Sequence, residues 1–592
     1  MTAPDTAVLG VTRSLTGRRW MWRPGEDRIG LGIAQALGVP EIIGRLLAAR
    51  GIGIAAAAHF LDPTLRALLP DPSTLADMDK AAMRLAAAVQ NGETVGVFGD
   101  YDVDGACSGA LMALVLRGLG CPVLAHVPDR LTEGYGPNLP ALQSLLARGA
   151  GLIVCVDCGT AAGEVFLALG GAADVLVLDH HKSEGPPPPV LATVNPNRLD
   201  CASGLTGLCA AGVAFLTAVA TVRALRRRGF FAARPEPDLL GLLDLVALAT
   251  VCDVMPLTGL NRALVAQGLK LMARRERPGI AALLEVAQVR DRPGAVTLGY
   301  ALGPRINAAG RISDADLGLR LLLTEDPLEA RSLAATLDAV NRQRQVVEAA
   351  MLDAAMTAAT AQVAAGHATV VVAGAAWHPG VVGIVAGRLK ERFNRPACVA
   401  GLADGMAKGS GRSVPGLDLG AAVIAARQAG LLASGGGHAM AAGFSLPETQ
   451  VAAFHAFLDE RLAAAALLPS AADLLVEGTL AVPGCTTELA AQLARLAPFG
   501  PGNAEPLLIL PRARVVRADR VGKEGTTIRA FVEGEGGGSR LKAVAFRAGE
   551  GDLATALLSR AGVALHLAGH LRAEAWNGRV GVTFVINDAA AV

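Results

Sequence analysis

The sequence predicts an α/β protein: a parallel-sheet domain and a second α/β domain joined by a long helical connector, followed by a C-terminal β-barrel. The chain has 592 residues, too many for one hydrophobic core, and 52% of them are hydrophobic. The first half alternates apolar strand-like runs with helix-like segments, which is typical of a parallel sheet with covering helices. The last part alternates short strands with turn residues, which favours a small antiparallel barrel or sandwich.

The parallel-sheet domain begins with an amphipathic helical pattern that leads into the apolar run VGVFG. Further apolar runs and helical patterns follow it in alternation. The expected strands lie at 95–99, 123–127, 152–156 and 175–178, and the expected helices at 76–90, 105–119 and 138–149. Such alternation builds strand–helix–strand units, so we expect the strands to run parallel.

Long helices are expected between the two α/β domains, because the chain from Asp316 to about Gly366 has almost no Pro or Gly. The second α/β domain is predicted from a strand at 368–373, a helix near 381–393, and Gly-rich loops at 409–411 and 435–437. The predicted boundaries are 1–75 for an N-terminal segment, 76–315 for the parallel-sheet domain, 316–365 for the connector, 366–462 for the second α/β domain and 472–592 for the barrel.

Charge and cysteine usage limit the functional class. The formal net charge of +1 argues against a uniformly basic nucleic-acid coat but permits a local basic groove. The nine cysteines show no paired spacing apart from Cys155 and Cys158, which lie in a Val-rich strand where zinc or redox chemistry is disfavoured. No signal-peptide pattern is visible at the N-terminus, so we expect a protein of the reducing cytoplasm. Uncharged stretches at 201–222 and 362–387 are interpreted as interior elements of a soluble protein.

Acidic and imidazole side chains follow the apolar runs where these runs end. We expect all four runs to be strands: VGVFG leads into Asp100, Asp102 and Asp104, LIVCV into Asp157, VLVL into Asp179, His180 and His181, and LVALATVC into Asp253. In an open parallel sheet, ligands bind outside the carboxyl ends of the strands. The sequence therefore predicts that these side chains converge in one crevice.

So many carboxylates would repel one another and raise one another's pKa values unless cations lay between them. Carboxylates with imidazole suit Mn²⁺ or Mg²⁺, and two such ions about 3.5–4 Å apart serve in-line phosphoryl displacement. The alternative is structural: an Asp after a strand is often the N-cap of the next helix, and a lone His is more often hydrogen-bonded than metal-bound. The conjunction of all of them in one domain favours a two-metal phosphoesterase.

The acidic motif and the Asp179-His180-His181 motif together resemble the DHH phosphoesterase superfamily. More narrowly, the chain resembles the RecJ family of bacterial single-stranded-DNA-specific 5′→3′ exonucleases over nearly its whole length. The motifs that carry this resemblance are FLDPTLRALLPDP, FGDYDVDGACS, PDRLTEGYG, NPNR, GPRINAAGRISDA, WHPGVVGIVAGRL, GSGRS, GGGHAMAAGF and PFGPGN. The resemblance implies a DHH domain, a DHHA1 domain and a C-terminal OB-fold.

The resemblance also implies roles for individual residues. The implied metal ligands are Asp102, Asp104, Asp157, His180 and Asp253, with Asp157 as the bridge. Asp100 is implied as an additional acid that closes the site, and His181 as a residue that orients the ligands or the phosphate. The implied substrate-binding residues are Arg130, Arg305, Arg311, Ser410, Arg412, Gly436, Gly437 and His438. Without the resemblance these last positions are weak candidates, because Gly-rich segments can be simple turns and surface arginines usually contact only water.

The function that the resemblance implies is removal of 5′-mononucleotides from single-stranded DNA during recombination and repair, with duplex excluded by a narrow passage. We expect a monomer whose partners are single-stranded DNA and, from the resemblance, single-stranded-DNA-binding protein. Two alternatives stay open. One is a DHH phosphatase that acts on small nucleotides or short oligonucleotides; the other is an inactive scaffold that only binds DNA.

Overall fold

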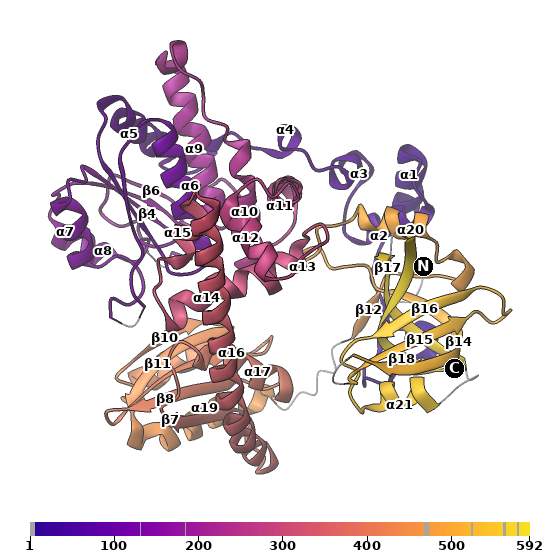
Figure 1. The fold of residues 1–592 in the computed structure, drawn as a ribbon. Helices are drawn as coiled ribbons and strands as arrows, with labels where there is room; N and C mark the ends of the chain where they lie inside the picture. Colours follow the sequence, from indigo (N-terminus) through magenta and orange to yellow (C-terminus); the bar gives the residue numbers. More distant parts are fainter. Residues whose placement is uncertain are drawn as a thin grey trace. The chain divides into compact units, whose positions relative to one another are not determined.

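The computed structural model describes residues 6–130, 132–183, 185–466, 473–522, 525–559, 564–576 and 579–592 (Figure 1). It divides into two compact units. One comprises Met1–Asp71, Val254–Leu269 and Ser470–Val592, and the other comprises Pro72–Asp253 and Lys270–Pro469. Among the described residues no single helix is long and apolar enough to cross a membrane; by length and composition alone, the bent pair Glu41–Ala49 and Ile54–Leu61 could.

The larger unit begins with the predicted parallel sheet. Its strands are β2 (Val95–Gly99), β3 (Val123–His126), β4 (Leu152–Val156), β5 (Asp174–Leu178) and β6 (Ala192–Val194), in the order β3-β2-β4-β5-β6, and all neighbours run parallel. The chain fills one side of β2 first and then the other, so the strand order switches between β2 and β4. Ligands bind at such a switch point in open α/β sheets.

Helices cover both faces of this sheet (Figure 1). They are α5 (Met78–Asn91), α6 (Val103–Gly118), α7 (Leu139–Ala147), α8 (Gly163–Leu169) and α9 (Ala210–Arg227). Helix α10 (Leu243–Cys252) packs on α6 and α9. The core under α7 and α8 includes Cys155 and Cys158, which are buried free thiols. Cys155 lies in β4 as predicted, whereas Cys158 lies two residues past the end of that strand.

One predicted strand was wrong. LVALATVC forms α10, and Asp253 is its C-cap. The physical reason is that α10 is almost wholly buried, and a short run that is apolar on every side has no period that distinguishes a helix from a strand.

Helices dominate the centre of the larger unit. They are α11 (Gly259–Met272), which begins in the other unit, α12 (Pro278–Val286), α13 (Ala295–Thr297), the π-helix η5 (Leu298–Leu302), α14 (Gly303–Ile312), α15 (Leu317–Leu323) and α16 (Pro327–Ala364). The connector predicted to form long helices contains one long helix, α16, which the seven-residue α15 precedes. The 38-residue α16 packs against α12, α14 and α15 at one end and against α17 (Val382–Phe393) and β7 (Val370–Ala375) at the other.

The second α/β domain has a mixed sheet. Besides β7 it contains β8 (Ala397–Ala403), β9 (Met406–Arg412), β10 (Ser434–His438) and β11 (Ala441–Pro447), in the order β10-β11-β9-β8-β7, with α17, α18 (Leu419–Gln428) and α19 (Val451–Ala466) around it. The Gly-rich loops predicted at 409–411 and 435–437 are strands. Glycine is needed there for packing: a Cβ on Gly409 would lie 2.3 Å from the ring of Phe444, and one on Gly411 would lie 2.6 Å from Leu419.

The smaller unit contains the predicted barrel. Its strands are β13 (Gly478–Thr479), β14 (Leu508–Val521), β15 (Thr527–Glu533), β16 (Arg540–Ala545), β17 (Ala564–Trp576) and β18 (Arg579–Ala591), and pairing of β14 with β17 closes the sheet. Its helices are α20 (Thr487–Ala494) and α21 (Asp552–Ser559).

The N-terminal segment belongs to the same unit as the barrel. It contributes β1 (Trp20–Trp22), which pairs with β12 (Leu474–Val476), and the helices α1 (Asp27–Leu37), α2 (Glu41–Ala49), α3 (Ile54–Leu61) and α4 (Leu65–Leu68). The buried Trp20 donates a hydrogen bond of 2.9 Å from Nε1 to Asp588 of β18. Buried Arg262 donates to the carbonyls of Phe60 and Leu496, so it ties α3 to the segment after α20.

Candidate metal centre

The turn between β2 and α6, together with the first turn of α6, carries the first three carboxylates. Asp102 is the N-cap of α6, and its Oδ1 accepts from the backbone N–H groups of Asp104 at 2.8 Å and Gly105 at 3.1 Å. A Cβ on Gly105 would lie 2.3 Å from the carbonyl oxygen of Asp100. The spacing of the motif is therefore fixed by capping and by close backbone approach.

Asp104 lies at the amino end of α9 as well as at that of α6. Its carboxylate accepts from the backbone N–H groups of Ala210 at 2.6 Å and Ala211 at 2.9 Å, and the residue is 1% exposed. A helix N-terminus favours negative charge, which helps to hold this buried carboxylate. Burial nevertheless raises its pKa.

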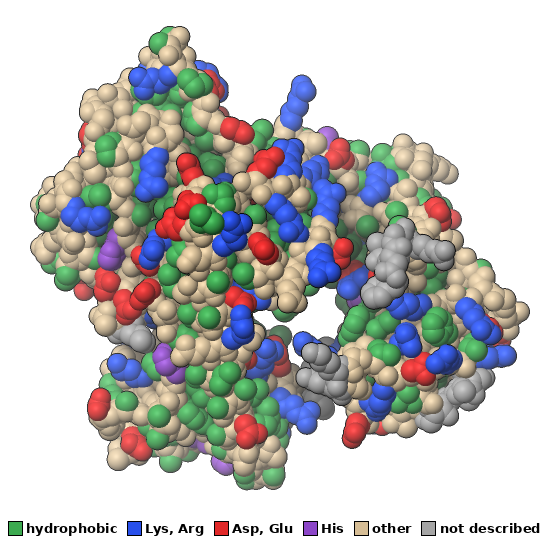
Figure 2. Space-filling model, in the orientation of Figure 1, with side chains coloured by type: hydrophobic (Ala, Val, Ile, Leu, Met, Phe, Trp, Pro, Cys, Tyr) green, Lys and Arg blue, Asp and Glu red, His purple; other side chains and the backbone are tan. Residues whose placement is uncertain are grey.

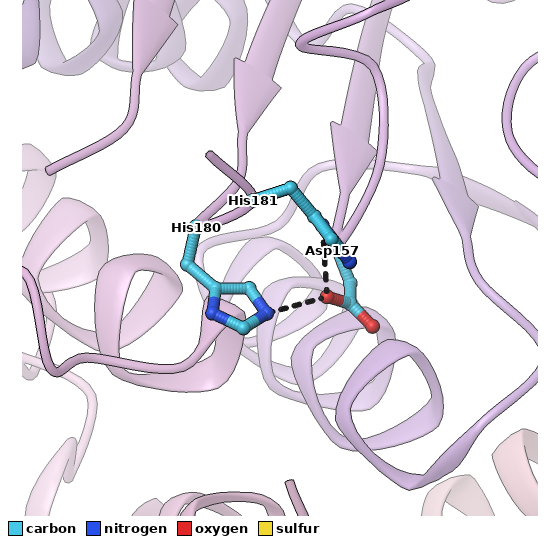
Figure 3. A group of neighbouring side chains, drawn as sticks. All are labelled: Asp157, His180 and His181. Atoms are coloured by element: carbon cyan, nitrogen blue, oxygen red, sulfur yellow. Dashed lines mark ion pairs between the residues drawn. The ribbon is translucent and has the colours of Figure 1, made fainter. Parts of the chain in front are cut away.

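Asp157 follows β4 with its backbone in the left-handed region, at φ 59°. His180, which follows β5, places Nε2 3.2 Å from Asp157 Oδ1, 3.6 Å from Asp104 Oδ2 and 3.4 Å from Asp253 Oδ2. Figure 3 shows His180 and His181 approaching one carboxylate oxygen of Asp157 from two sides. One imidazole thus joins carboxylates from the first turn of α6, the turn after β4 and the C-cap of α10.

Asp179 positions the two histidines. It accepts from the backbone N–H groups of His180 at 2.7 Å and His181 at 3.1 Å, and its Oδ1 lies 2.8 Å from His181 Nδ1. Burial works against its negative charge, but these bonds and that from Thr160 outweigh burial and hold the pKa of Asp179 below its usual range. Burial likewise lowers the pKa of His181, but the bond to Asp179 and the surrounding carboxylates outweigh it and raise that pKa to about 9.

Two asparagines of the NPNR motif support this turn. Asn195 donates to the carbonyl of His181 at 2.8 Å, and Asn197 donates to the carbonyl of His180 at 2.6 Å. Both bonds fix backbone that carries a candidate ligand, as outer partners of metal sites do.

The remaining carboxyl groups, Asp100 and Asp253, lie where their charged form is poorly stabilised. Burial, followed by neighbouring carboxylates, raises the pKa of Asp100 to about 8 and that of Asp253 to about 8. Asp100 Oδ1 and Asp253 Oδ2 are buried and have no hydrogen-bond partner among the described residues, and the contact of Asp253 Oδ2 with His180 Nε2 at 3.4 Å is an ion-pair contact without hydrogen-bond geometry. Buried carboxylate oxygens without donors are what a cation site requires.

These donors form overlapping groups whose ligand atoms lie within 4.8 Å of one another. The groups are Asp100, Asp102 and Asp157; Asp104, His180 and Asp253; and Asp157, His180 and His181. Asp157 and His180 each belong to two groups. The donor set, carboxylate oxygens with imidazole nitrogen, fits divalent cations, and all seven residues predicted for catalysis or metal binding come together here.

Guanidinium groups lie beside the carboxylates. Arg130 lies over the ring of Tyr101, 5.1 Å from its centroid, and Arg311 donates from Nη1 to the carbonyl of Gly380 at 2.9 Å. Burial, followed by the charges of Arg130 and Arg344, lowers the pKa of Arg311 to about 10. Burial and Arg130 also lower the pKa of Arg412. Mutual destabilisation of cations marks a place where an anion would bind favourably.

The predicted residues of the second domain share one face of its sheet. Ser410 and Gly436 both pair with Gly443 of β11, while Arg412 and His438 both pair with Ala441. Directly paired residues, and residues two apart on a strand, point to the same face. Gly437 lies between Gly436 and His438 on β10, so its position belongs to the opposite face of the sheet.

Helix α17 begins on this same face. A Cβ on Gly383, in the first turn of α17, would lie 3.2 Å from Arg412 Nη2 and 3.6 Å from Ser410 Oγ. Backbone N–H groups at a helix N-terminus favour an anion. Ser410 and Arg412 therefore lie where a phosphate would be held, whereas His438 is exposed further along the face.

Arg305 is placed differently from Arg311. Its guanidinium pairs with Asp338 of α16 at 2.9 Å and donates to the carbonyl of Ala301 at 2.7 Å. Six positions separate Arg305 from Arg311 on α14, so their side chains leave different sides of the helix. The contacts described for Arg305 do not bring it to the carboxylates.

Sequence reasoning assigned no role to several residues at the site. Tyr135 Oη lies 3.3 Å from the carbonyl oxygen of Asp157 and 3.3 Å from both ring nitrogens of His181. Arg344 of α16 and His378 also lie near the guanidinium groups. Tyr135 and His378 belong to the EGYG and WHPG motifs. The sequence shows these motifs, but it does not show that the two side chains point toward the site.

Family models match three successive parts of the chain: "DHH family, N-terminal domain" over residues 94–250, "DHHA1 domain" over 365–464 and "RecJ OB domain" over 476–588. The chain is 34% identical over 585 residues to the single-stranded-DNA-specific exonuclease RecJ of Bacillus subtilis, covering 97% of this chain and 71% of that protein. It is 39% identical over 525 residues to the protein of the same name in Escherichia coli, covering 86% of this chain and 89% of that one.

Comparison with solved structures gives the same family. The crystal structure of RecJ in complex with Mn²⁺ from Thermus thermophilus superposes with a TM-score of 0.79 at 32% identity, covering 96% of this chain and 79% of that one. The Mg²⁺ complex from the same organism has a TM-score of 0.74 at 30% identity, covering 96% and 78%. The predicted order of a DHH domain, a DHHA1 domain and an OB-fold is thereby confirmed. With three matched domains in order and relatives of this identity and coverage, the chain belongs to the RecJ family.

Proposed function

We propose that this protein is a 5′→3′ exonuclease that hydrolyses single-stranded DNA to 5′-mononucleotides with the help of two divalent cations. One observation carries the proposal: Asp157 and His180 are each shared by two donor groups at the switch point of the sheet. Relatives named single-stranded-DNA-specific exonuclease support the substrate.

Two cations held by these groups would activate a water and stabilise the attacking and leaving oxygens of an in-line displacement. The chain's own residues bind the phosphate and orient the groups around it. Arg130, Arg311 and Arg412 hold phosphate oxygens, since a guanidinium can bond two of them at once. Asp179 keeps His181 oriented and cationic beside the phosphate, while Asp102 and Asp104 are held by backbone N–H groups before substrate arrives.

The 5′ polarity follows from the anion site on the second sheet. Ser410, Arg412 and the first turn of α17 form a place for a terminal phosphate, and Arg311 lies within electrostatic reach of Arg412. A terminal phosphate held there would set the distance from the strand end to the carboxylates. The bond that is cut would then be the one nearest the 5′ end.

The test uses purified protein, Mn²⁺ and single-stranded oligonucleotides labelled at the 5′ end or at the 3′ end, with matched duplex and an Asp157→Ala control. We expect immediate release of labelled mononucleotide from the 5′-labelled strand, and none from duplex or from the variant. Cleavage restricted to dinucleotides and small phosphoesters would favour the small-substrate phosphatase. Binding without cleavage in Mn²⁺ or Mg²⁺ would favour the inactive scaffold.

The cellular setting is also part of the proposal. We propose a cytoplasmic monomer that acts in DNA recombination and repair and that meets single-stranded-DNA-binding protein on its substrate. The imidazole in the donor set favours Mn²⁺ over Mg²⁺. Metal titration, sedimentation and pull-down with the purified partner test these points separately from the cleavage assay.

A further inference from the structure

A polar cleft in the larger unit is not used by the proposed chemistry. Its volume is about 380 Å³, and Gln288, Tyr300, Arg305, Asn341 and Arg342 contribute to its lining. We call it the Tyr300 cleft. A second cavity of about 510 Å³, which includes Arg275 and Arg290 in its lining, shares Gln288 with it and therefore lies beside it. Figure 2 shows Lys and Arg side chains gathered near the centre of the view, where Figure 1 places α12 and α13.

The π-helix η5 presents an aromatic ring at this cleft. Leu298 and Leu302 are fully buried at its two ends, whereas Tyr300 between them is 82% exposed. The chain has three tyrosines, and the other two, Tyr101 and Tyr135, lie at the metal centre. A π-turn within helical structure is uncommon and frequently occurs at functional sites. An exposed ring held on a buried, rigid turn is a platform for stacking.

Two guanidinium groups share one carboxylate in the lining of this cleft. Asp338 is 7% exposed and pairs with both Arg305 and Arg342, so one positive charge is left over. The side chain of Arg342 is 71% exposed, which leaves guanidinium N–H groups free for another anion. Asn341 and Gln288 add side-chain amides to the lining. The cleft therefore offers a flat ring, cationic donors and neutral donors together.

The cleft is also tied to the metal centre through shared elements. A Cβ on Gly303 would lie 2.4 Å from Cys252 Sγ, so the junction of η5 and α14 packs against the end of α10, directly before Asp253. Along α14, Arg305 and Arg311 are six residues apart, or about 9 Å at ~1.5 Å per residue. A single strand that leaves the metal centre therefore has to extend only a few nucleotides to reach the cleft.

We infer that the Tyr300 cleft binds a downstream nucleotide of the single strand, with Tyr300 stacked on a base and Arg342 on a phosphate. This inference rests on the proposed function and deepens it by adding a second point of attachment. A non-specific single-strand site is built from such a ring and such charges, because every base has a face to stack and every linkage a phosphate. An oligonucleotide that is too short to reach the cleft should bind with the same affinity whether or not Tyr300 and Arg342 are present.

The experiment measures Kd by fluorescence anisotropy with 5′-phosphorylated oligo-dT of 3 and 12 nucleotides, in an Asp157→Ala background that prevents cleavage. Tyr300→Ala should weaken binding of the 12-mer about tenfold, the magnitude of one lost base–aromatic stack, and Tyr300→Phe should restore it. Arg342→Ala should weaken the 12-mer and reduce the salt dependence of log Kd by about one phosphate contact. Both losses should be confined to oligonucleotides long enough to reach the cleft.

Two controls make the result specific. Arg320→Ala removes an exposed arginine of α15 that does not line the cleft, and it should leave the 12-mer affinity as it was. A 12-mer with abasic sites beyond its third nucleotide should be insensitive to Tyr300→Ala but still sensitive to Arg342→Ala. If both variants bind the 12-mer as tightly as the Asp157→Ala parent, the inference is wrong.

The proposed function is tested separately, by cleavage with the protein that retains Asp157. If that protein cleaves the labelled strand and the cleft variants bind normally, only the inference fails. If it cleaves no single strand at all, the proposed function fails whatever the cleft variants do.

Discussion

His180 Nε2 lies 3.2 Å from Oδ1 of Asp157, a residue whose backbone is held at φ 59°. Left-handed backbone is uncommon for residues with a side chain, and such conformations persist where the surrounding structure imposes them. Here the turn after β4 aims the carboxylate of Asp157 between two donor groups that include Asp102 on one side and His180 on the other.

Asp157→Asn should reduce kcat for single-stranded DNA by more than about 100-fold, because loss of an outer partner alone typically costs 10–100-fold and Asp157 is a candidate ligand itself. Burial raises the pKa of Asp157 well above its usual value, so a neutral amide should not lower the melting temperature of the metal-free protein. Kinetics and calorimetry check both parts. A variant that cleaved normally would remove Asp157 from the site.

The metal-free protein should become less stable as the pH rises. Asp100 and Asp253 have folded-state pKa values raised from 3.8 to about 8, so the folded state retains protons that the unfolded state releases. Stability is then lost progressively between these values, because the carboxyl groups ionise freely in the unfolded state but keep their protons in the folded state. We expect the melting temperature in a chelator to fall from about pH 5 to pH 8, and the increment from added Mn²⁺ to grow over the same range. Asp253→Asn should flatten the metal-free curve; an unchanged slope would contradict the assignment.

Asp179→Asn should act through His181. Without the carboxylate, the pKa of His181 should fall from about 9 toward its ordinary 6.5, so the imidazole would be neutral at pH 8 in the variant and cationic in the parent. If cationic His181 helps to hold the phosphate, kcat/KM should drop by about 10–100-fold at pH 8 and by much less at pH 6. The pH profile separates this from a structural defect, which would lower activity equally at both pH values.

Gly105→Ala should disrupt the acidic turn. The new Cβ would lie 2.3 Å from the carbonyl oxygen of Asp100, so the turn must shift and the carboxylates with it. We expect loss of Mn²⁺ binding in calorimetry together with a lower melting temperature. Gly118→Ala on the same helix is the matched control: nothing lies within 4 Å of its Cβ, so it should be neutral or stabilise by up to ~1 kcal/mol. Equal effects of the two substitutions would refute this explanation of the motif.

Arg412→Lys should weaken the use of 5′-phosphorylated strands. Lys keeps the charge but loses the planar fork, which matters where phosphate is bound through two N–H groups. We expect KM to rise by about tenfold with a smaller change in kcat, and the preference for a 5′-phosphate over a 5′-hydroxyl end to shrink. Arg320→Lys on the exposed surface should change neither. An unaltered end preference would place the terminal phosphate elsewhere.

The sequence by itself determined the alternation of strands and helices, and with it the parallel sheet and the convergence of Asp100, Asp102, Asp104, Asp157 and His180. This was possible because strand ends are local features and the carboxyl ends of parallel strands meet at one edge. The sequence also accounts for the spacing of the acidic motif, because a helix-capping Asp and a Gly that permits close backbone approach can both be identified from the order of residues.

Only the tertiary structure decided where long side chains and uniform apolar runs would lie. The run before Asp253 is a helix because it is buried on every side, which leaves no periodicity to read. Arg305 and Arg311 share one motif but leave α14 on different sides, so one pairs with Asp338 and the other lies at the site. Arg412 and His438 lie on one face of the sheet because of the register of β9, β11 and β10. Each of these is fixed by contacts between residues distant in the chain, about which a single sequence carries no local signal.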